Sequence, residues 1–107
     1  MKIGVPKEIK PQENRIGLTP DSVKTLVSEG HEVLVENNGG FEAGFENDQY
    51  LKAGAKIADT AADIFNDAEI IVKVKEPQKE EVDMIRENQI VYTLSLIHIS
   101  EPTRPVV

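Results

Sequence analysis

The chain has 107 residues, no cysteine and a formal net charge of −7. This length suits one domain with a modest core, the lack of cysteine excludes disulfides and cysteine-ligated zinc, and the acidic balance argues against binding to nucleic acid or to an anionic membrane. No apolar stretch approaches the roughly 20 residues of a membrane span. Because Met1-Lys2 leads into a predicted strand and not into a signal-peptide core, we expect a soluble cytoplasmic protein.

The first part of the chain alternates between strand and helix patterns. Residues 3–6 predict a short strand. Thr19-Pro20-Asp21 predicts a helix start, with an N-cap hydroxyl, a proline at the first helical position and an acid in the first turn. Gly30 ends this helix, residues 31–36 alternate between polar and apolar side chains as in a strand, and residues 37–40 have turn chemistry.

The middle of the chain continues the alternation. Asn47 or Asp48 is expected to cap a short helix that Gly54 closes, and residues 55–58 predict a brief strand. Thr60, with Asp63 three residues later, resembles a capping box. A third helix is therefore predicted, with its apolar positions at helical spacing: Ala61, Ile64, Phe65 and Ala68.

The last predicted elements complete an α/β pattern. Residues 69–74 form an almost continuous β-branched run, which is typical of a central parallel strand covered on both faces. Residues 80–88 predict a helix with Val82, Met84 and Ile85 as apolar positions, and residues 89–94 predict another strand. The alternation implies an α/β fold with a parallel sheet, flanking helices and right-handed crossovers, Rossmann-like or flavodoxin-like.

Arg15 lies in the loop between the first strand and the first helix, where α/β proteins often place a group that binds a small anion. A guanidinium matches a carboxylate through two parallel hydrogen bonds. The alternative is a surface arginine paired with Glu13 or Glu8, and spacing alone favours that alternative.

Lys73 and Lys75 alternate with valines, so both lysines point to one face of the predicted strand. Lys75 is nearer the carboxyl end of the strand, where open α/β sheets bind ligands. Both lysines could instead reach solvent at a sheet edge. If the first interpretation holds, Arg15 and Lys75 provide two cationic groups for one carboxylate.

Several site types have little support in the sequence. His31, at the turn before a strand, is expected to be an exposed or capping histidine. Asp, Glu and His show no spacing typical of a metal site. No G-x-G-x-x-G motif follows any predicted strand, so this chain alone is not expected to bind NAD well.

The motifs together resemble a known family. MKIGVPKEIKPQENRIGLTP at residues 1–20, GHEVLVENNGG at 30–40, AGA at 53–55 and IVKVKEP at 71–77 are similar to the amino-terminal part of alanine dehydrogenase. The alpha subunit of nicotinamide nucleotide transhydrogenase is similar in the same places. The resemblance covers residues 1–93 and implies a partial substrate-binding domain, in which Arg15 and Lys75 bind the carboxylate and carbonyl of L-alanine or pyruvate.

The resemblance also implies properties of the full-length protein. It would oxidise L-alanine to pyruvate and ammonia, with NAD bound by a domain absent from this chain, and would be a homo-oligomer. The runner-up interpretations are the transhydrogenase alpha subunit and a stand-alone sensor domain for a carboxylate metabolite.

Residues 94–107 depart from the family pattern. They include SLIHISEPTRP, which resembles a translated sequencing-adapter peptide, so we expect this tail not to be native sequence. The family's proton-transferring histidine would lie where this chain has Leu96, and His98 is displaced from that position by about 7 Å along a strand. His98 is therefore a poor substitute, and we expect the 107-residue chain to be catalytically inactive.

Overall fold

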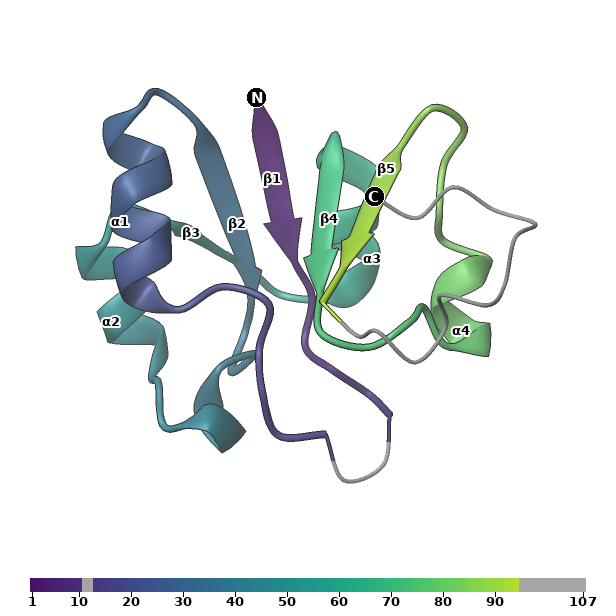
Figure 1. Cartoon of the computed structure of the whole chain (residues 1–107), viewed down its shortest axis with the longest axis horizontal. Helices are drawn as coiled ribbons and strands as arrows, with labels where there is room; N and C mark the ends of the chain where they lie inside the picture. Colours follow the sequence, from purple (N-terminus) through teal and green to yellow (C-terminus); the bar gives the residue numbers. More distant parts are fainter. Residues whose placement is uncertain (11–12, 95–107) are drawn as a thin grey trace.

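The computed structural model describes residues 1–10 and 13–94 of the chain. Within these residues, five parallel strands form one sheet in the order β3-β2-β1-β4-β5 (Figure 1). The strands are β1 (Lys2–Val5), β2 (Glu32–Glu36), β3 (Lys56–Ala58), β4 (Ile70–Lys73) and β5 (Ile90–Thr93). The predicted α/β class with a parallel sheet and flanking helices is confirmed.

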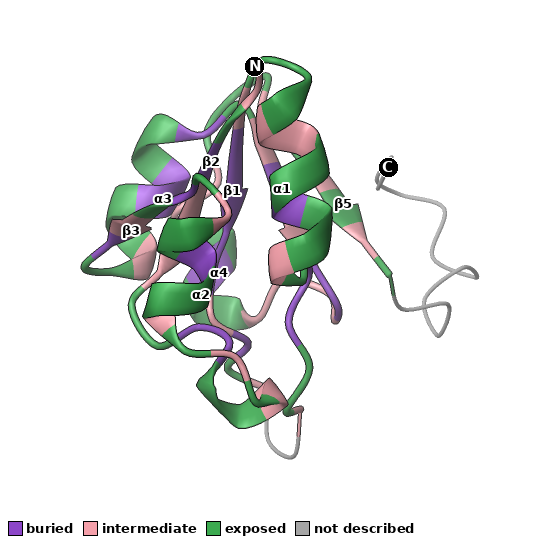
Figure 2. Cartoon of the chain, turned by 90° about the vertical axis from the view of Figure 1, so that its left-hand side faces the viewer, coloured by how far each residue is buried: buried purple, intermediate pink, exposed green. Residues whose placement is uncertain are grey.

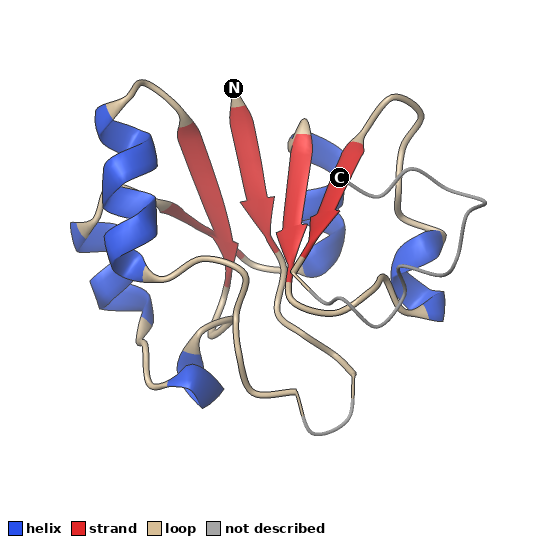
Figure 3. Ribbon diagram, in the orientation of Figure 1, coloured by secondary structure: helices blue, strands red, loops and turns tan. Residues whose placement is uncertain are grey.

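The helices lie on both faces of the sheet (Figure 3). They are α1 (Pro20–Ser28), α2 (Asn47–Lys52), α3 (Ala61–Asp67) and α4 (Lys79–Val82), with a short 3-10 helix, η1 (Phe41–Ala43), before α2. None of the helices among the described residues is long and apolar enough to cross a membrane.

Two apolar clusters hold the layers together. One packs α1 and the α2 region on the first face of the sheet, with Ile3, Val5, Val23, Val33, Val35 and Tyr50 buried. The other packs α3 on the opposite face and buries Ile64, Phe65, Ala68 and Ile71. Each cluster removes apolar side chains from water, which is the main favourable contribution to folding.

The order of the strands places a topological switch between β1 and β4. The chain runs from β1 outward through β2 to β3, and then crosses to β4 on the other side of β1. All strands are parallel, so the loops that follow β1 and β4 leave the same edge of the sheet, side by side (Figure 3). Open α/β sheets bind ligands at such a point.

The caps of the first and third helices follow the predictions. The Thr19 hydroxyl accepts the Ser22 N–H at 3.2 Å, and the Thr60 hydroxyl accepts the Asp63 N–H at 3.2 Å. Gly30 follows α1 with φ +97°, the left-handed region that glycine adopts without strain.

The predicted cap of α2 is wrong. The N-cap is Glu46, whose backbone N–H donates to Gln49 Oε1 at 2.8 Å. The side chain of Asn47 is used elsewhere, because it accepts the Asn38 N–H and donates to Asn37 Oδ1 in the preceding turn. Asn47 is thus the first residue of α2, and its side-chain amide binds the preceding turn and does not cap the helix.

The predicted helix over residues 80–88 is also wrong in extent, because α4 ends at Val82. The Arg86 N–H, which a continued helix would direct to Val82, donates instead to Gln89 Oε1 at 3.0 Å. The Arg86 and Gln89 side chains in turn donate to the carbonyls of Phe65 and Ala68. These bonds tie the segment to the end of α3 and replace the helical ladder.

The prediction that β4 is covered on both faces holds for one face only. Ile71 is buried on the α3 face, whereas Val72 on the other face is half-buried. Helices α1 and α2 cover the β1 to β3 part of that second face, and Ile90 and Tyr92 of β5 stay 43% and 45% exposed beside it. Figure 2 accordingly shows exposed and intermediate residues along β5, whereas β1 is mostly buried.

The predicted non-native tail begins at Leu94, which extends the β5 pairing through its N–H to Lys73 O at 2.9 Å. The rest of the tail, residues 95–107 with His98 among them, lies outside the described residues.

Candidate functional site at the carboxyl edge of β1 and β4

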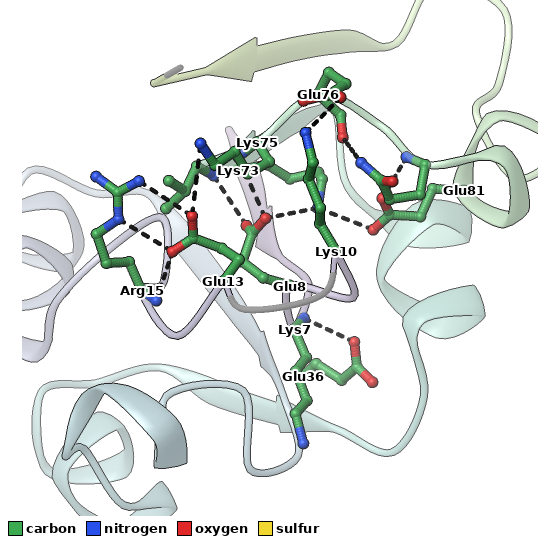
Figure 4. A network of polar contacts seen from close by, with 12 residues as sticks. Lys7, Glu8, Lys10, Glu13, Arg15, Glu36, Lys73, Lys75, Glu76 and Glu81 are labelled. Atoms are coloured by element: carbon green, nitrogen blue, oxygen red, sulfur yellow. Dashed lines mark hydrogen bonds and ion pairs between the residues drawn. The ribbon is translucent and has the colours of Figure 1, made fainter. Parts of the chain in front are cut away.

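The two predicted site residues meet at one carboxylate, that of Glu13 (Figure 4). Arg15 donates from Nε to Glu13 Oε2 at 3.0 Å and from Nη2 to Glu13 Oε1 at 3.1 Å. Lys75 Nζ lies 4.0 Å from Glu13 Oε1. Thus Arg15 and Lys75, from the loops after β1 and β4, converge on the same side of the molecule. The pairing of Arg15 with Glu13, which spacing alone favoured, is also present.

The pairing with Glu13 leaves much of the Arg15 guanidinium available. A guanidinium carries five N–H donors, and Glu13 takes one from Nε and one from Nη2. Within the described part of the chain the guanidinium makes no other hydrogen bond, and the side chain is 68% exposed. The Nη1 N–H groups and the second Nη2 N–H can therefore donate to a second carboxylate.

Glu13 is held as an anion. Its side chain is only 5% exposed. The hydrogen bond from the Arg15 side chain lowers the pKa of Glu13 and outweighs burial, which raises it; the Arg15 backbone N–H and Lys75 lower this pKa further. The same contact raises the pKa of Arg15. The site therefore combines two cations with one fixed negative charge.

The loop that carries Arg15 is anchored on both sides of that residue. Ile16 is buried in the core, and the backbone of Gly17 lies against β4 so closely that a Cβ there would be 2.5 Å from the Val72 carbonyl oxygen. The Tyr50 hydroxyl donates to the Leu18 carbonyl at 2.8 Å. These contacts hold the loop over the end of β4, next to Lys75.

Lys73 and Lys75 alternate on the same side of the chain but differ in burial and in partners. The side chain of Lys73 is fully buried, and Nζ lies 3.1 Å from Glu8 Oε1 and 3.0 Å from Glu81 Oε2. The interpretation that both lysines reach solvent is therefore wrong for Lys73, because the two buried carboxylates compensate its charge inside the protein. The side chain of Lys75, beyond the end of β4, is 19% exposed.

Glu8 connects the two loops. Its Oε2 accepts the Val74 N–H at 2.9 Å, and its Oε1 accepts the Lys75 N–H at 3.3 Å, in addition to the ion pair with Lys73. The backbone at Lys75 is thereby fixed to the loop after β1. Charge-assisted hydrogen bonds of this kind are among the stronger ones in proteins.

The roles of three acids were not predictable from local sequence patterns. Glu8 and Glu13 stood out only as alternative partners of Arg15, and Glu81 did not stand out. A signal was present, since a lysine on a buried β-strand face requires acidic partners. Which acids supply them depends on contacts between residues far apart in the chain, because Glu8 and Lys73 are separated by 65 positions.

Other charges surround this cluster. Lys10 Nζ and Glu76 Oε2 form an ion pair at 3.1 Å, with side chains about one-third exposed (33% and 31%). Glu36 accepts the Lys7 N–H at 2.8 Å, and burial raises its pKa. The charged cluster therefore runs from the partly exposed pair of Lys10 and Glu76 to the fully buried Lys73 at the carboxyl edge of the sheet.

The remaining candidates lie elsewhere or lack the required features. His31 precedes β2 and so lies at the amino edge of the sheet, opposite Arg15 and Lys75, with Nδ1 buried and without a hydrogen-bond partner in the described structure. The residue is intermediate in exposure. Its backbone N–H donates to the Leu26 carbonyl at 3.2 Å just after α1, which fits the capping alternative of the prediction. Among the described residues, no group of three acids or histidines could hold a metal ion. The described strands do not lead into a G-x-G-x-x-G turn.

Comparison with known proteins gives a consistent result. The family model "Alanine dehydrogenase/PNT, N-terminal domain" matches residues 4–105. Alanine dehydrogenases from Staphylococcus epidermidis and Bacillus subtilis are each 50% identical to the chain over 93 residues, which is 87% of this chain and 25% and 24% of those proteins. The chain thus spans about a quarter of the length of these relatives.

Solved structures agree with the sequence relatives. An L-alanine dehydrogenase superposes with a TM-score of 0.84 at 48% identity, covering 87% of this chain and 26% of that one. The transhydrogenase from Sinorhizobium meliloti superposes with a TM-score of 0.82 at 34% identity, covering 89% of this chain and 28% of that one. The resemblance inferred from the motifs is confirmed, and the chain belongs to the alanine dehydrogenase/PNT N-terminal domain family.

Proposed function

We propose that this chain is the substrate-carboxylate-binding part of an NAD-dependent L-alanine dehydrogenase. The complete protein would convert L-alanine, NAD and water to pyruvate, ammonia and NADH. In this proposal Arg15 and Lys75 hold the acid end of alanine or pyruvate, and so fix the substrate for hydride transfer. Orientation of this kind can contribute much of a rate enhancement.

The observation that carries the proposal is the convergence of Arg15 and Lys75 at the switch point between β1 and β4. Each cation comes from a different loop, and the end of the Arg15 fork remains available after the pairing with Glu13. Two cations and one carboxylate give a net charge of +1, which one substrate carboxylate would neutralise. Arginine suits this role because its planar fork binds a carboxylate in two places.

NAD enters the proposal as a cofactor of the complete protein. The chain spans about a quarter of the length of its alanine dehydrogenase relatives, so we assign NAD binding to a different part of a longer polypeptide. We accordingly expect no alanine-dependent NADH formation by the purified 107-residue chain.

The transhydrogenase alpha subunit is the second candidate, since a transhydrogenase shares the fold at a similar TM-score. The dehydrogenase ranks first because the identity is 48% to the L-alanine dehydrogenase structure and 34% to the transhydrogenase.

The proposal can be tested by titrating the isotope-labelled chain with pyruvate and following the NMR signals of the Arg15 and Lys75 side chains. We expect saturable but weak binding. Arg15→Lys should weaken it roughly tenfold, because the charge remains while the bidentate fork is lost. Lys75→Met should weaken it as well.

Lys56→Met provides the matched control, because Lys56 is an exposed lysine on β3 whose one ion pair within residues 1–10 and 13–94 is with Glu32, at 3.6 Å. It should leave pyruvate binding unchanged. Equal affinity of Arg15→Lys and the unmodified chain would contradict the proposal. Tight binding of pyruvate without NAD would favour the sensor interpretation.

A further inference from the structure

We propose that Glu13 is a specificity-determining residue that makes this site prefer a monocarboxylate over a dicarboxylate. The inference rests on the proposed carboxylate-binding function and adds a role for a residue that does not itself supply the binding cations.

The geometry allows Glu13 and a bound acid to be present together. Glu13 occupies the Nε–Nη2 edge of the Arg15 guanidinium, at 3.0 and 3.1 Å. A ligand carboxylate can use the Nη1–Nη2 end of the same fork, because Nη1 makes no hydrogen bond to the described residues and the Arg15 side chain is 68% exposed. Glu13 therefore does not have to leave when a ligand binds.

Glu13 is also fixed in place. Its side chain is 5% exposed, and it accepts the backbone N–H of Arg15 at 2.8 Å in addition to the side-chain bonds. A carboxylate anchored by three hydrogen bonds cannot move away from an approaching anion as a flexible surface side chain would.

The charges then decide which ligands fit. Arg15 and Lys75 contribute two positive charges and Glu13 one negative charge, so the three residues together carry +1. One ligand carboxylate neutralises this charge. A second carboxylate on the same small ligand finds no further positive charge among these three residues, and Glu13 repels it.

The neighbouring buried residues act in the same direction. Glu8, Lys73 and Glu81 together carry a charge of −1, and Glu8 accepts the backbone N–H of Lys75. With it, the six side chains carry no net charge before a ligand binds, so a second ligand carboxylate adds a negative charge that none of them compensates. Because the charge of these buried residues stays in place when Glu13 is changed, a substitution at Glu13 isolates the contribution of that residue alone.

The test compares L-lactate with L-malate, two stable acids that differ by one carboxylate, in binding titrations of the full 107-residue chain. The measured quantity is the ratio of the two affinities. In Glu13→Gln, which keeps the shape but removes the charge, this ratio should shift about tenfold toward L-malate. Glu13→Asp keeps the charge, so L-lactate should remain preferred.

Glu32→Gln is the matched control, because it removes the same charge from β2 at the opposite edge of the sheet. It should leave the ratio unchanged. If Glu13→Gln does not fold, Glu13→Ser removes the same charge and should shift the ratio in the same direction.

Two results would overturn the inference in different ways. Equal loss of affinity for both acids in the Glu13 variants would mean that Glu13 only positions Arg15, while the proposed function would stand. Unchanged lactate binding in Arg15→Lys and Lys75→Met, or no binding of either acid to any form, would remove the proposed function and this inference with it.

Discussion

Replacing Lys73 with Met is expected to cost the protein a large part of its stability. Lys73 Nζ lies 3.1 Å from Glu8 and 3.0 Å from Glu81, and the three side chains are 0%, 2% and 1% exposed. At an effective dielectric constant of about 20, each attraction amounts to roughly 5 kcal/mol before desolvation is counted. Met fills a similar volume but leaves two buried carboxylates without their counter-charge.

The expected loss is about 3–5 kcal/mol in the free energy of unfolding, as for other buried pairs that lose one partner. Domains of this size have total stabilities of about 5–15 kcal/mol, so this loss is a large fraction of the total. Because the free energy of unfolding falls by about 1–3 kcal/mol per molar urea, the midpoint of unfolding should be lower by about 2 M. The assay is urea denaturation of the 107-residue chain, followed by circular dichroism.

Lys10→Met is the matched control, because Lys10 makes an ion pair of similar length, 3.1 Å, with a partly exposed carboxylate. It should cost less than about 1 kcal/mol. The double variant Lys73→Met/Glu81→Gln should recover part of the loss, since it leaves one fewer unpaired charge. Equal losses in Lys73→Met and Lys10→Met would refute the reasoning.

Three further predictions concern the support of the site. Gly17→Ala should displace the loop from β4 and weaken pyruvate binding, because its Cβ would lie 2.5 Å from the Val72 oxygen; an unchanged affinity in the same titration would contradict this. Tyr50→Phe should lower the free energy of unfolding, measured by urea denaturation, by about 1 kcal/mol, because the Leu18 carbonyl loses its 2.8 Å hydrogen bond. Burial raises the pKa of Tyr50 to about 12, so an ultraviolet titration of the unmodified chain should show this phenol ionising only near that pH. The pKa of Glu36 is raised in the folded state, so the unfolded chain releases this proton at a lower pH than the folded chain. The Glu36→Gln variant should therefore gain stability relative to the unmodified chain as pH rises above about 4.3. A difference in melting temperature between the two chains that does not change with pH would count against this prediction.

The sequence predicted the elements whose signals are local. Thr19 and Thr60 cap their helices as expected because each hydroxyl needs only an N–H three residues away. The parallel sheet followed from the alternation of strand and helix patterns, since parallel strands require a crossover. The predicted extent of the helix at residues 80–88 was wrong because its end depends on distant residues: the side chains of Arg86 and Gln89 donate hydrogen bonds to carbonyls at the end of α3.

The sequence by itself determined the fold class, because periodicity and caps are properties of neighbouring positions. It singled out Arg15 and Lys75 through their places after predicted strands together with their match to the family's motifs. Only the tertiary structure decided that Glu13 lies between these two cations and that Lys73 is buried between Glu8 and Glu81. Ion pairs in a sheet edge depend on which strands are adjacent, and that order brings together residues more than 60 positions apart. No local pattern contains this information.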